Sequence, residues 1–373
     1  MTADRFVDLA CLTYGNDESR ERREQAAALL AQQPALVDAS VHAAAAAGDP
    51  DALRAHLAAG SIDARDPTRG WEPLLVLCYS RVAQRDALAC LDLLLAHGAD
   101  PNAFATITEC RFTALTGVIA QGEGGPLEQP SHPQARALAV RLLDAGASPD
   151  DSQALYNTHF LPSNEWLELL LARGLSSPGD LTFMLGQAAV QGFADRVRLL
   201  LAHGVAPDGT NHYNRRSHVE NALLDGHAEI ARQLIAAGAT WPTFADHERF
   251  RIAVLANDEA EARRVLAASP TANTKSGTLI ATAKHGRLAS LRLALTLGVP
   301  IDGLDAQGLT ALHHAARGGQ LEAVRALVEH GASLTIRDPR YGGTPLGHAK
   351  HFASRWPTVH AAEIVDFLAQ RSP

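Results

Sequence analysis

The sequence predicts an all-α protein built from repeated helix–turn–helix units, on three observations. The segment from Asp305 to Gly331 reads as a turn, a short helix, a second turn, a longer amphipathic helix and a closing glycine. Helices that end in the same way recur along the chain. Only 5% of the 373 residues are aromatic while alanine is abundant, which favours closely packed helices over a β-sandwich. We therefore expect an α-solenoid.

Residue types within this segment account for its elements. Thr310 is expected to cap the first helix by accepting hydrogen bonds from backbone N–H groups two or three residues later, and Ala315 and Ala316 let a neighbouring helix approach. Apolar residues at helical spacing form the buried stripe of the second helix: Leu321, Val324, Leu327 and Val328. One such unit cannot bury its own apolar face, so copies are expected on either side.

The residue that closes the second helix locates the copies. It recurs as Gly60, Gly98, Gly146, Gly174, Gly204, Gly238, about Ser269, Gly298 and Gly331, and a last helix, EIVDFLAQR, ends the chain. Most spacings lie near the roughly 33 residues of one helix-pair unit. We predict about ten units over residues 36–373, forming a single elongated domain with irregular central repeats. Residues 1–35, with helices over 4–13 and 19–33, are expected to form an N-terminal helical cap.

This order of parts resembles one ankyrin repeat. The family's signature positions are occupied by Thr310, Leu312, Ala315, Ala316, Gly319, Val324, Leu327 and Gly331, and the starts at Glu72-Pro73-Leu74, Thr113-Ala114-Leu115 and Thr344-Pro345-Leu346 look similar. The resemblance implies an ankyrin-repeat α-solenoid, of a kind met in bacterial proteins, whose first helices and turn tips line a concave groove. The units over 151–174 and 241–269 lack this start, which leaves their first helices uncertain.

Departures from the repeat length point to insertions. Residues 122–133 (GEGGPLEQPSHP) and 351–360 (HFASRWPTVH) exceed the repeat, and the turn over 207–218 is unusually polar. Insertions in a solenoid lie on one face or edge, often the one that binds. The intervals that end at Gly174 and Gly298 are short, so those repeats are expected to lack a full hairpin finger.

Composition argues against several function classes. A net charge of −8 disfavours a nucleic-acid-binding surface, and no apolar run is long enough to span a bilayer. The four cysteines, Cys11, Cys78, Cys90 and Cys110, lack CxxC spacing, which suggests a reducing, cytoplasmic compartment. Cys78 and Cys110 adjoin apolar runs and are expected to be buried and inert. No phosphate loop or GxSxG motif occurs, so we predict no cofactor.

The resemblance also implies which residues face the groove. In the family's pattern, the residue two positions after the leucine of each TPL-type helix start points toward the groove. The resulting ladder is Ala43, Val76, Gly117, Asn157, Gln187, Asn221, Ile252, Ala281, His314 and His348. With flanking positions, the predicted binding residues are Trp71, Arg81, Asn157, Gln187, Tyr213, Arg215, Asn221, His314 and His348. For each of them an ordinary solvated position is the alternative. Trp166 falls on a buried stripe, whereas Tyr213 and Tyr341 lie in turns.

Two functions are therefore weighed. The first is a non-catalytic protein that binds a protein or peptide partner, with no nucleic-acid or membrane partner. The second is an enzyme or small-molecule-binding protein whose groove and insertions form a pocket. Its acid–base candidates are Glu72, Tyr79, Tyr156, His159 and His314. The spacing of His348 and His351 would suit a metal, but His313 stands where the family's histidine serves the turn, so no metal is predicted.

Overall fold

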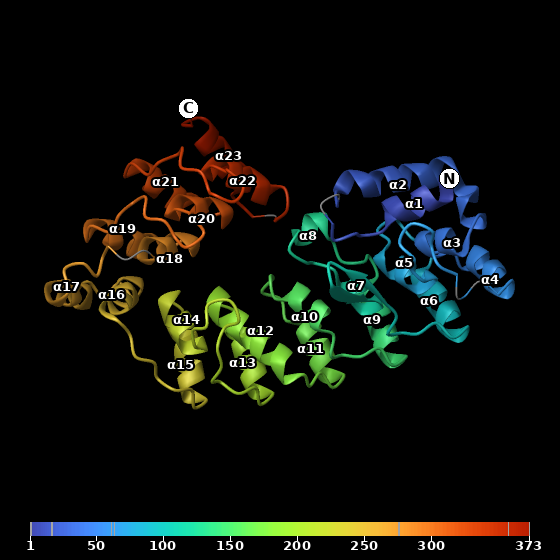
Figure 1. The fold of residues 1–373 in the computed structure, drawn as a ribbon, viewed down its shortest axis with the longest axis horizontal. Helices are drawn as coiled ribbons and strands as arrows, with labels where there is room; N and C mark the ends of the chain where they lie inside the picture. Colours follow the sequence, from blue (N-terminus) through green and yellow to red (C-terminus); the bar gives the residue numbers. More distant parts are fainter. Residues whose placement is uncertain are drawn as a thin grey trace. The chain divides into compact units, whose positions relative to one another are not determined.

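The computed structural model describes residues 2–15, 18–60, 62, 64–274, 277–356 and 358–372 (Figure 1). The chain divides into two compact units, Met1–Asp180 and Leu181–Pro373, and each is described by itself. Helices make up both units, which confirms the all-α class, and the described residues contain a single two-stranded sheet. No helix in this part of the chain is long and apolar enough to cross a membrane.

Unit 1 begins with the two expected N-terminal helices, α1 (Thr2–Ala10) and α2 (Arg20–Gln32), and the short η1 (Pro34–Asp38). Four helix pairs follow, and we call the first helix of each pair inner and the second outer. They are α3 (Val41–Ala47) with α4 (Pro50–Ala58), α5 (Pro73–Tyr79) with α6 (Ala87–Ala96), α7 (Ala114–Ile119) with α9 (Ala135–Asp144), and α10 (Ser152–Thr158) with α11 (Glu165–Ala172). Inner helices pack on inner helices.

Unit 2 continues the same arrangement. Its pairs are α12 (Pro178–Gln191), which begins in the last residues of unit 1, with α13 (Ala194–Ala202), α14 (His218–Leu224) with α15 (Ala228–Ala236), α16 (Asp246–Leu255) with α17 (Glu259–Ala268), α18 (Thr278–Lys284) with α19 (Leu288–Thr296), α20 (Ala311–Arg317) with α21 (Leu321–Glu329), and α22 (Pro345–Ala353) with α23 (Ala361–Ala369). The described residues thus contain ten pairs, as expected. Inner helices α10 and α16 form despite their atypical starts. The N-terminal cap over residues 1–35 and the single elongated array over residues 36–373 remain predictions.

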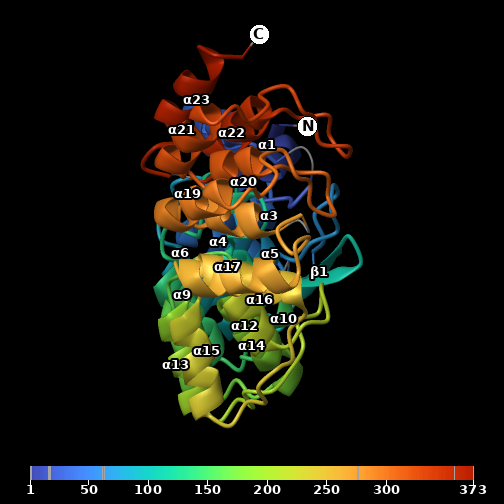
Figure 2. The same cartoon turned by 90° about the vertical axis from the view of Figure 1, so that its left-hand side faces the viewer.

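Turns between the pairs follow their local sequence. Thr310 Oγ1 accepts from the His313 backbone N–H, as expected, and Ser40, Thr113, Ser217 and Thr344 cap their helices in the same way. One turn is a β-hairpin, in which β1 (Phe104–Ile107) pairs antiparallel with β2 (Cys110–Thr113). The turn before α10 is short, as predicted. The turn before α18 contains Lys275 and Ser276, which lie outside the described residues. Within unit 2, the turns between pairs lie along one side (Figure 2).

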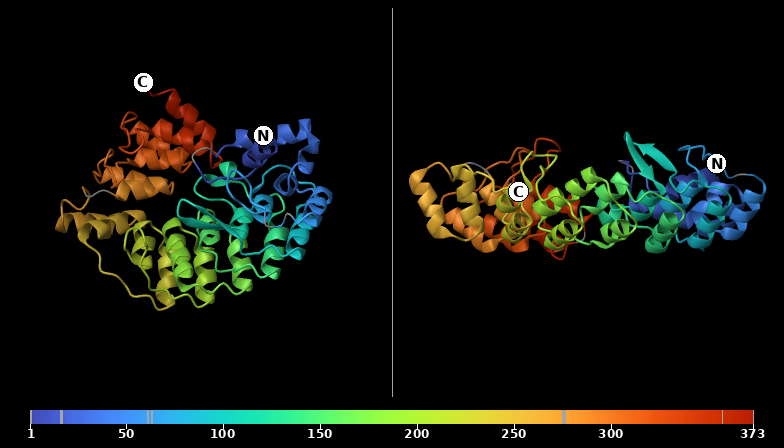
Figure 3. Two further views of the ribbon diagram at one scale, coloured as in Figure 1. Left: turned by 45° about the vertical axis from the view of Figure 1, so that its right-hand side comes forward. Right: turned by 90° about the horizontal axis from the view of Figure 1, so that it is seen from below.

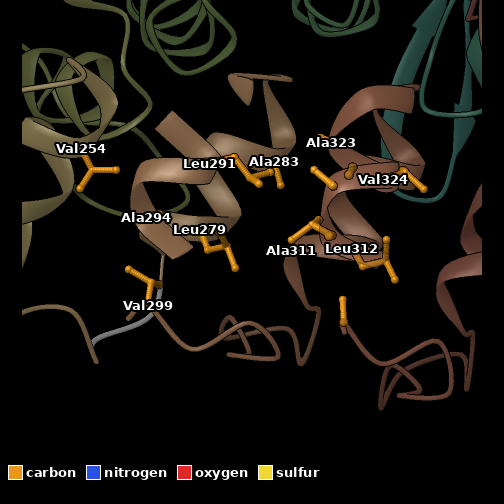
Figure 4. Close-up of a cluster of buried hydrophobic side chains, with 14 of the residues drawn as sticks. Val254, Leu279, Ala283, Leu291, Ala294, Val299, Ala311, Leu312, Ala323 and Val324 are labelled. Carbon is orange, nitrogen blue, oxygen red and sulfur yellow. The ribbon is translucent and has the colours of Figure 1, made fainter. Parts of the chain in front are cut away.

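A continuous apolar core joins the last four pairs of unit 2. Side chains from α16 to α23 belong to one buried cluster, and Figure 4 shows members of neighbouring pairs, such as Leu279, Ala311 and Leu312, pointing toward one another. Leu321, Val324 and Leu327 are buried as predicted, and Val328 packs at the margin. Alanines at the helix contacts allow the close approach, so each pair completes the burial of the next.

Close packing in unit 1 depends on a glycine. Tyr79 is fully buried at the end of α5, and its hydroxyl donates to Thr113 O (2.9 Å). A Cβ added to Gly117 of α7 would lie 2.2 Å from Tyr79 Cε2. Any side chain at this position therefore has to displace the ring.

We predict that Gly117→Ala lowers the free energy of unfolding by about 1–3 kcal/mol because it overpacks the contact with Tyr79. Urea unfolding of the purified chain measures the change. The control is Gly179→Ala, whose added Cβ meets nothing within 4 Å and which should be neutral or slightly stabilising. Equal stability of the two variants would mean that Tyr79 does not pack on Gly117.

His313 is held neutral by its contacts. Its Nδ1 accepts from the Thr310 backbone N–H (3.2 Å), which leaves Nε2 as the donor to Gly343 O (3.3 Å). The side chain is fully buried, and burial lowers its pKa to about 4. A proton on Nδ1 would remove the acceptor that Thr310 needs.

Because the unfolded state takes up this proton near pH 6.5 and the native state only near pH 4, His313 stabilises the fold above pH 6.5. We expect this contribution to be lost as the pH falls, by up to about 1 kcal/mol per pH unit. Urea unfolding at pH 7 and pH 5 should show a smaller loss for His313→Gln than for the wild type. His97→Gln, at an exposed site, should keep the wild-type slope, and an unchanged slope in His313→Gln would contradict the assignment.

Candidate functional site

In unit 1 the chain covers its own inner helices. Residues 10–14 run along the end of α5, where the Leu12 N–H donates to Tyr79 O (3.0 Å) and the Arg81 N–H donates to Ala10 O (2.8 Å). At the end of this segment, the Tyr14 ring lies 4.7 Å from the Phe112 ring, and the Asn157 side chain donates to the Tyr14 hydroxyl (3.3 Å). The N-terminal segment therefore occupies the surface that the sequence had assigned to a ligand.

The insertion over 122–133 closes on the same region. It contains the short helix α8 (Gly125–Glu128), and Arg23 of α2 holds this helix through Leu127 O (2.9 Å) and Glu128 O (2.7 Å). The Arg23 guanidinium also pairs with Glu18 (2.8 Å), and the side chains of both residues are buried. The insertion is thus fastened to the N-terminal helices and lies against the inner side of unit 1.

A polar cluster remains where the insertion meets α10. The Glu123 carboxylate accepts from the Tyr156 hydroxyl, and the Tyr156 ring lies 4.9 Å from the His159 ring. His159 Nδ1 contacts the backbone oxygen of Tyr156, and its ring packs on Phe160. Sequence reasoning named Tyr156 and His159 but missed Glu123, because a carboxylate 33 residues away in an insertion carries no signal that it folds back.

Other predicted residues of unit 1 serve the fold. Trp71, a predicted binding residue, is buried, and its ring lies 4.9 Å from that of Tyr79, so it packs in the core of unit 1. Burial raises the pKa of Tyr79 well above its usual value, which removes it from acid–base chemistry at neutral pH. Arg81 donates to carbonyl oxygens of its own chain, including Pro130 O (2.7 Å) and Gly117 O. Glu72 pairs with Arg65 (2.7 Å).

The amide ladder is buried as well. Asn157 in unit 1 and Gln187 and Asn221 in unit 2 are all at least 93% buried, so they do not form the exposed row that was expected. Asn221 bonds both Asn214 (2.8 Å) and Ser217 O (3.1 Å) and so holds the turn before α14. Ala43, the first position of the predicted ladder, is fully buried as well and does not face a groove.

Two further predicted residues of unit 2, His314 and His348, contact aspartates of the turns before their helices. His314 Nε2 contacts Asp305 Oδ2 (2.7 Å), and His348 Nε2 contacts Asp338 Oδ2 (3.0 Å). Each aspartate also accepts backbone N–H groups of its own turn, for Asp338 those of Arg340, Tyr341 and Gly343. The two histidines therefore brace the turns, a role the sequence signals through an aspartate at the same position of each turn.

The tip residues Tyr213 and Arg215 are exposed as expected. Their turn is shaped by the Asn211 N–H, which donates to Arg216 O (2.8 Å), and by a bridge between Thr210 and Ser217. Trp241, Leu304 and Tyr341 are exposed on later turns of unit 2, whereas Trp166 is buried as predicted. The turns of this unit thus present large side chains on a fixed backbone.

The four cysteine thiols are free, and three of them are buried. Cys78 is buried as expected, and burial raises its pKa to about 12. The expectation for Cys110 is wrong, because it begins strand β2 at the exposed end of the hairpin. Within the described ranges, no three His, Cys, Asp or Glu side chains are grouped so that they could hold a metal ion. Pro357, in the predicted insertion over 351–360, lies outside those ranges.

We expect Arg23→Ala to lower the free energy of unfolding by about 3 kcal/mol, because it leaves Glu18 buried without its cation and frees two carbonyls of the insertion. Hydrogen exchange should rise over residues 123–130. Arg20→Ala, which breaks an exposed pair with Glu24 on the same helix, should change stability by less than about 1 kcal/mol. Wild-type exchange over 123–130 in Arg23→Ala would show that the clamp does not hold the insertion.

Comparisons with known proteins agree with this architecture. The family model for ankyrin repeats, in three copies, matches residues 251–371. The ankyrin repeat protein nuc-2 of Neurospora crassa is 31% identical over 231 residues, which cover 57% of this chain and 22% of that protein. The chain therefore spans about a fifth of the relative's length. Together with the helix pairs of each unit and the Thr310–His313 turn, these matches show that the chain contains ankyrin repeats.

Proposed function

We propose that the chain is a non-catalytic binding protein that engages a protein partner through the turn tips of unit 2. The observation that carries this proposal is the exposure of large apolar side chains on the turns before α14, α16, α20 and α22: Tyr213 (64%), Trp241 (64%), Leu304 (49%) and Tyr341 (74%). Such residues cost free energy in water and supply most of the binding energy when a partner buries them. We define these four residues as the tip row.

Rigid support favours binding by the tip row. The Asp338 carboxylate fixes the turn that carries Tyr341, and the Arg340 guanidinium lies 5.0 Å from the Tyr341 ring. The turn that carries Trp241 is tied to the preceding one, because the Thr240 N–H donates to Asp208 Oδ1 (2.9 Å). Little conformational entropy is then lost when a partner docks. Tyr, Trp and Arg are also the residue types most often found at the centres of protein interfaces.

The enzyme alternative has less support. Of its five acid–base candidates, Tyr79 is buried in the core, Glu72 is paired with Arg65, and His314 braces a turn through Asp305. Tyr156 and His159, joined by Glu123, are the polar group that would serve it. Ankyrin repeats as a class are interaction modules with extended binding surfaces. A reducing, cytoplasmic compartment stays part of the proposal, on the four free cysteines.

The proposal predicts that Tyr213→Ala/Trp241→Ala abolishes capture of the partner from extracts of the source cell, while the melting temperature stays at the wild-type value. With the purified partner, loss of about 2 kcal/mol would weaken binding roughly thirtyfold. Isothermal titration calorimetry provides the measurement. Arg232→Ala/Arg263→Ala, on exposed outer-helix sites, serves as the control. If the tip variant captures the same proteins with the same affinity, the tip row is not the binding surface.

A further inference from the structure

Six polar residues converge where α14, α16 and α18 of unit 2 come together. The Asp225 carboxylate, at the end of α14, accepts from Arg251 Nη2 of α16 (2.9 Å) and lies 3.7 Å from Lys284 Nζ of α18. Arg287, just after α18, reaches Asp225 O (3.4 Å) and His227 Nδ1 (3.2 Å). The ring of His285 lies 4.7 Å from that of His227. Two cations therefore contact the Asp225 carboxylate, and a third contacts its backbone oxygen.

The charge of this cluster is not balanced. Burial lowers the pKa of His227 to about 4 and that of His285 to about 3, so both are neutral at pH 7. Arg251, Lys284 and Arg287 then outnumber Asp225 by two charges. Burial also lowers the pKa of Arg251 and of Arg287, with Asp225 as the main opposing influence. This positive excess stands out in a chain whose net charge is −8.

Hydrogen bonding within the cluster is incomplete too. Arg251 Nε, Arg287 Nε and His285 Nε2 are enclosed and have no hydrogen-bond partner among the described residues. Buried donors are normally satisfied, and a missing ion or ligand is one of the established explanations for exceptions. The unpaired donors and the excess charge both call for an anionic group.

The next inner helix adds a fourth cation. Arg317 ends α20 beside Lys284, since a Cβ on its neighbour Gly318 would lie 3.1 Å from Lys284 O. Its guanidinium rests on the Phe352 ring at 4.4 Å, and in the described part of the chain no carboxylate forms an ion pair with it. The carboxylates that act on its charge, Asp305 and Asp338, already contact His314 and His348. We define Arg251, Lys284, Arg287 and Arg317 as the cationic row.

We propose that the cationic row binds the carboxylates of an acidic peptide segment in the protein partner, an inference that rests on the proposed function and names the chemistry of its partner. The cations come from three neighbouring inner helices, α16, α18 and α20, and inner helices pack about 8–10 Å apart. An extended peptide covers that distance in about three residues. Guanidinium groups bind carboxylates through paired hydrogen bonds. The row therefore suits a peptide with acidic residues at about every third position.

The test uses the full chain and a fluorescein-labelled peptide of twelve residues with glutamate at every third position. Fluorescence anisotropy should show binding that weakens as salt rises, and the same peptide with glutamine in place of glutamate should not bind. Lys284→Gln/Arg317→Gln should weaken binding about tenfold or more, from the loss of charged contacts. Arg232→Gln/Arg263→Gln, which removes the same charge from outer helices, should leave it unchanged. If the double variant fails to fold, Lys284→Gln alone, with its side chain 36% exposed, provides the comparison.

Two results would overturn the proposal. One is equal affinity of the glutamate peptide for the wild type and the folded variant. The other is binding of inorganic phosphate or a thymidine oligonucleotide that depends on Lys284 and Arg317, with no preference for glutamate over glutamine. The tip variant Tyr213→Ala/Trp241→Ala should bind the peptide normally. Partner capture that needs the tip row, with no peptide binding, would reject this inference and leave the proposed function standing, whereas peptide binding without tip-dependent capture would reject the proposed function alone.

Discussion

Each helix pair of this chain buries only part of its apolar surface, and it gains a full core only by stacking on its neighbours. In unit 2 this requirement produces one buried cluster that runs from α16 to α23. Small residues set the spacing, because Ala311, Ala315 and Ala283 bring the inner helices together. The two views of Figure 3 show the paired helices repeating within each unit. Turns and helix ends are therefore the parts left free to vary for binding.

Where the repeat becomes irregular, buried arginine side chains also hold neighbouring segments together. Arg23 and Arg81 hold the insertion of unit 1 through backbone carbonyls, and Arg251 links α14 and α16 of unit 2 through Asp225. Arg23 and Arg81 donate to acceptors of their own chain. Arg251 belongs to a cluster whose charge and hydrogen bonds are incomplete. This difference separates a surface that the chain has closed on itself from one at which we propose that a partner binds.

Local signals in the sequence predicted most of the fold. The caps, closing glycines and apolar stripe of the unit at 305–331 depend on neighbouring residues, and all appear as expected. The site was harder, because exposure depends on segments distant in sequence. The Asn157 side chain bonds Tyr14, 143 residues away, and the Asn221 side chain bonds the backbone of its own turn. Glu123 and Asp225 were missed because neither lies in a motif, and only the folded chain brings them to their partners.

The central claim is that unit 1 covers its own inner helices while the turns and inner-helix ends of unit 2 remain available to a partner. Hydrogen–deuterium exchange of the full chain, with and without the purified partner, tests it most directly. We expect new protection over the turns at 210–217, 239–245 and 332–344, with residues 10–14 and 122–133 unchanged. Protection confined to residues 10–14 and 122–133, with the turns of unit 2 exchanging as in the free protein, would contradict it.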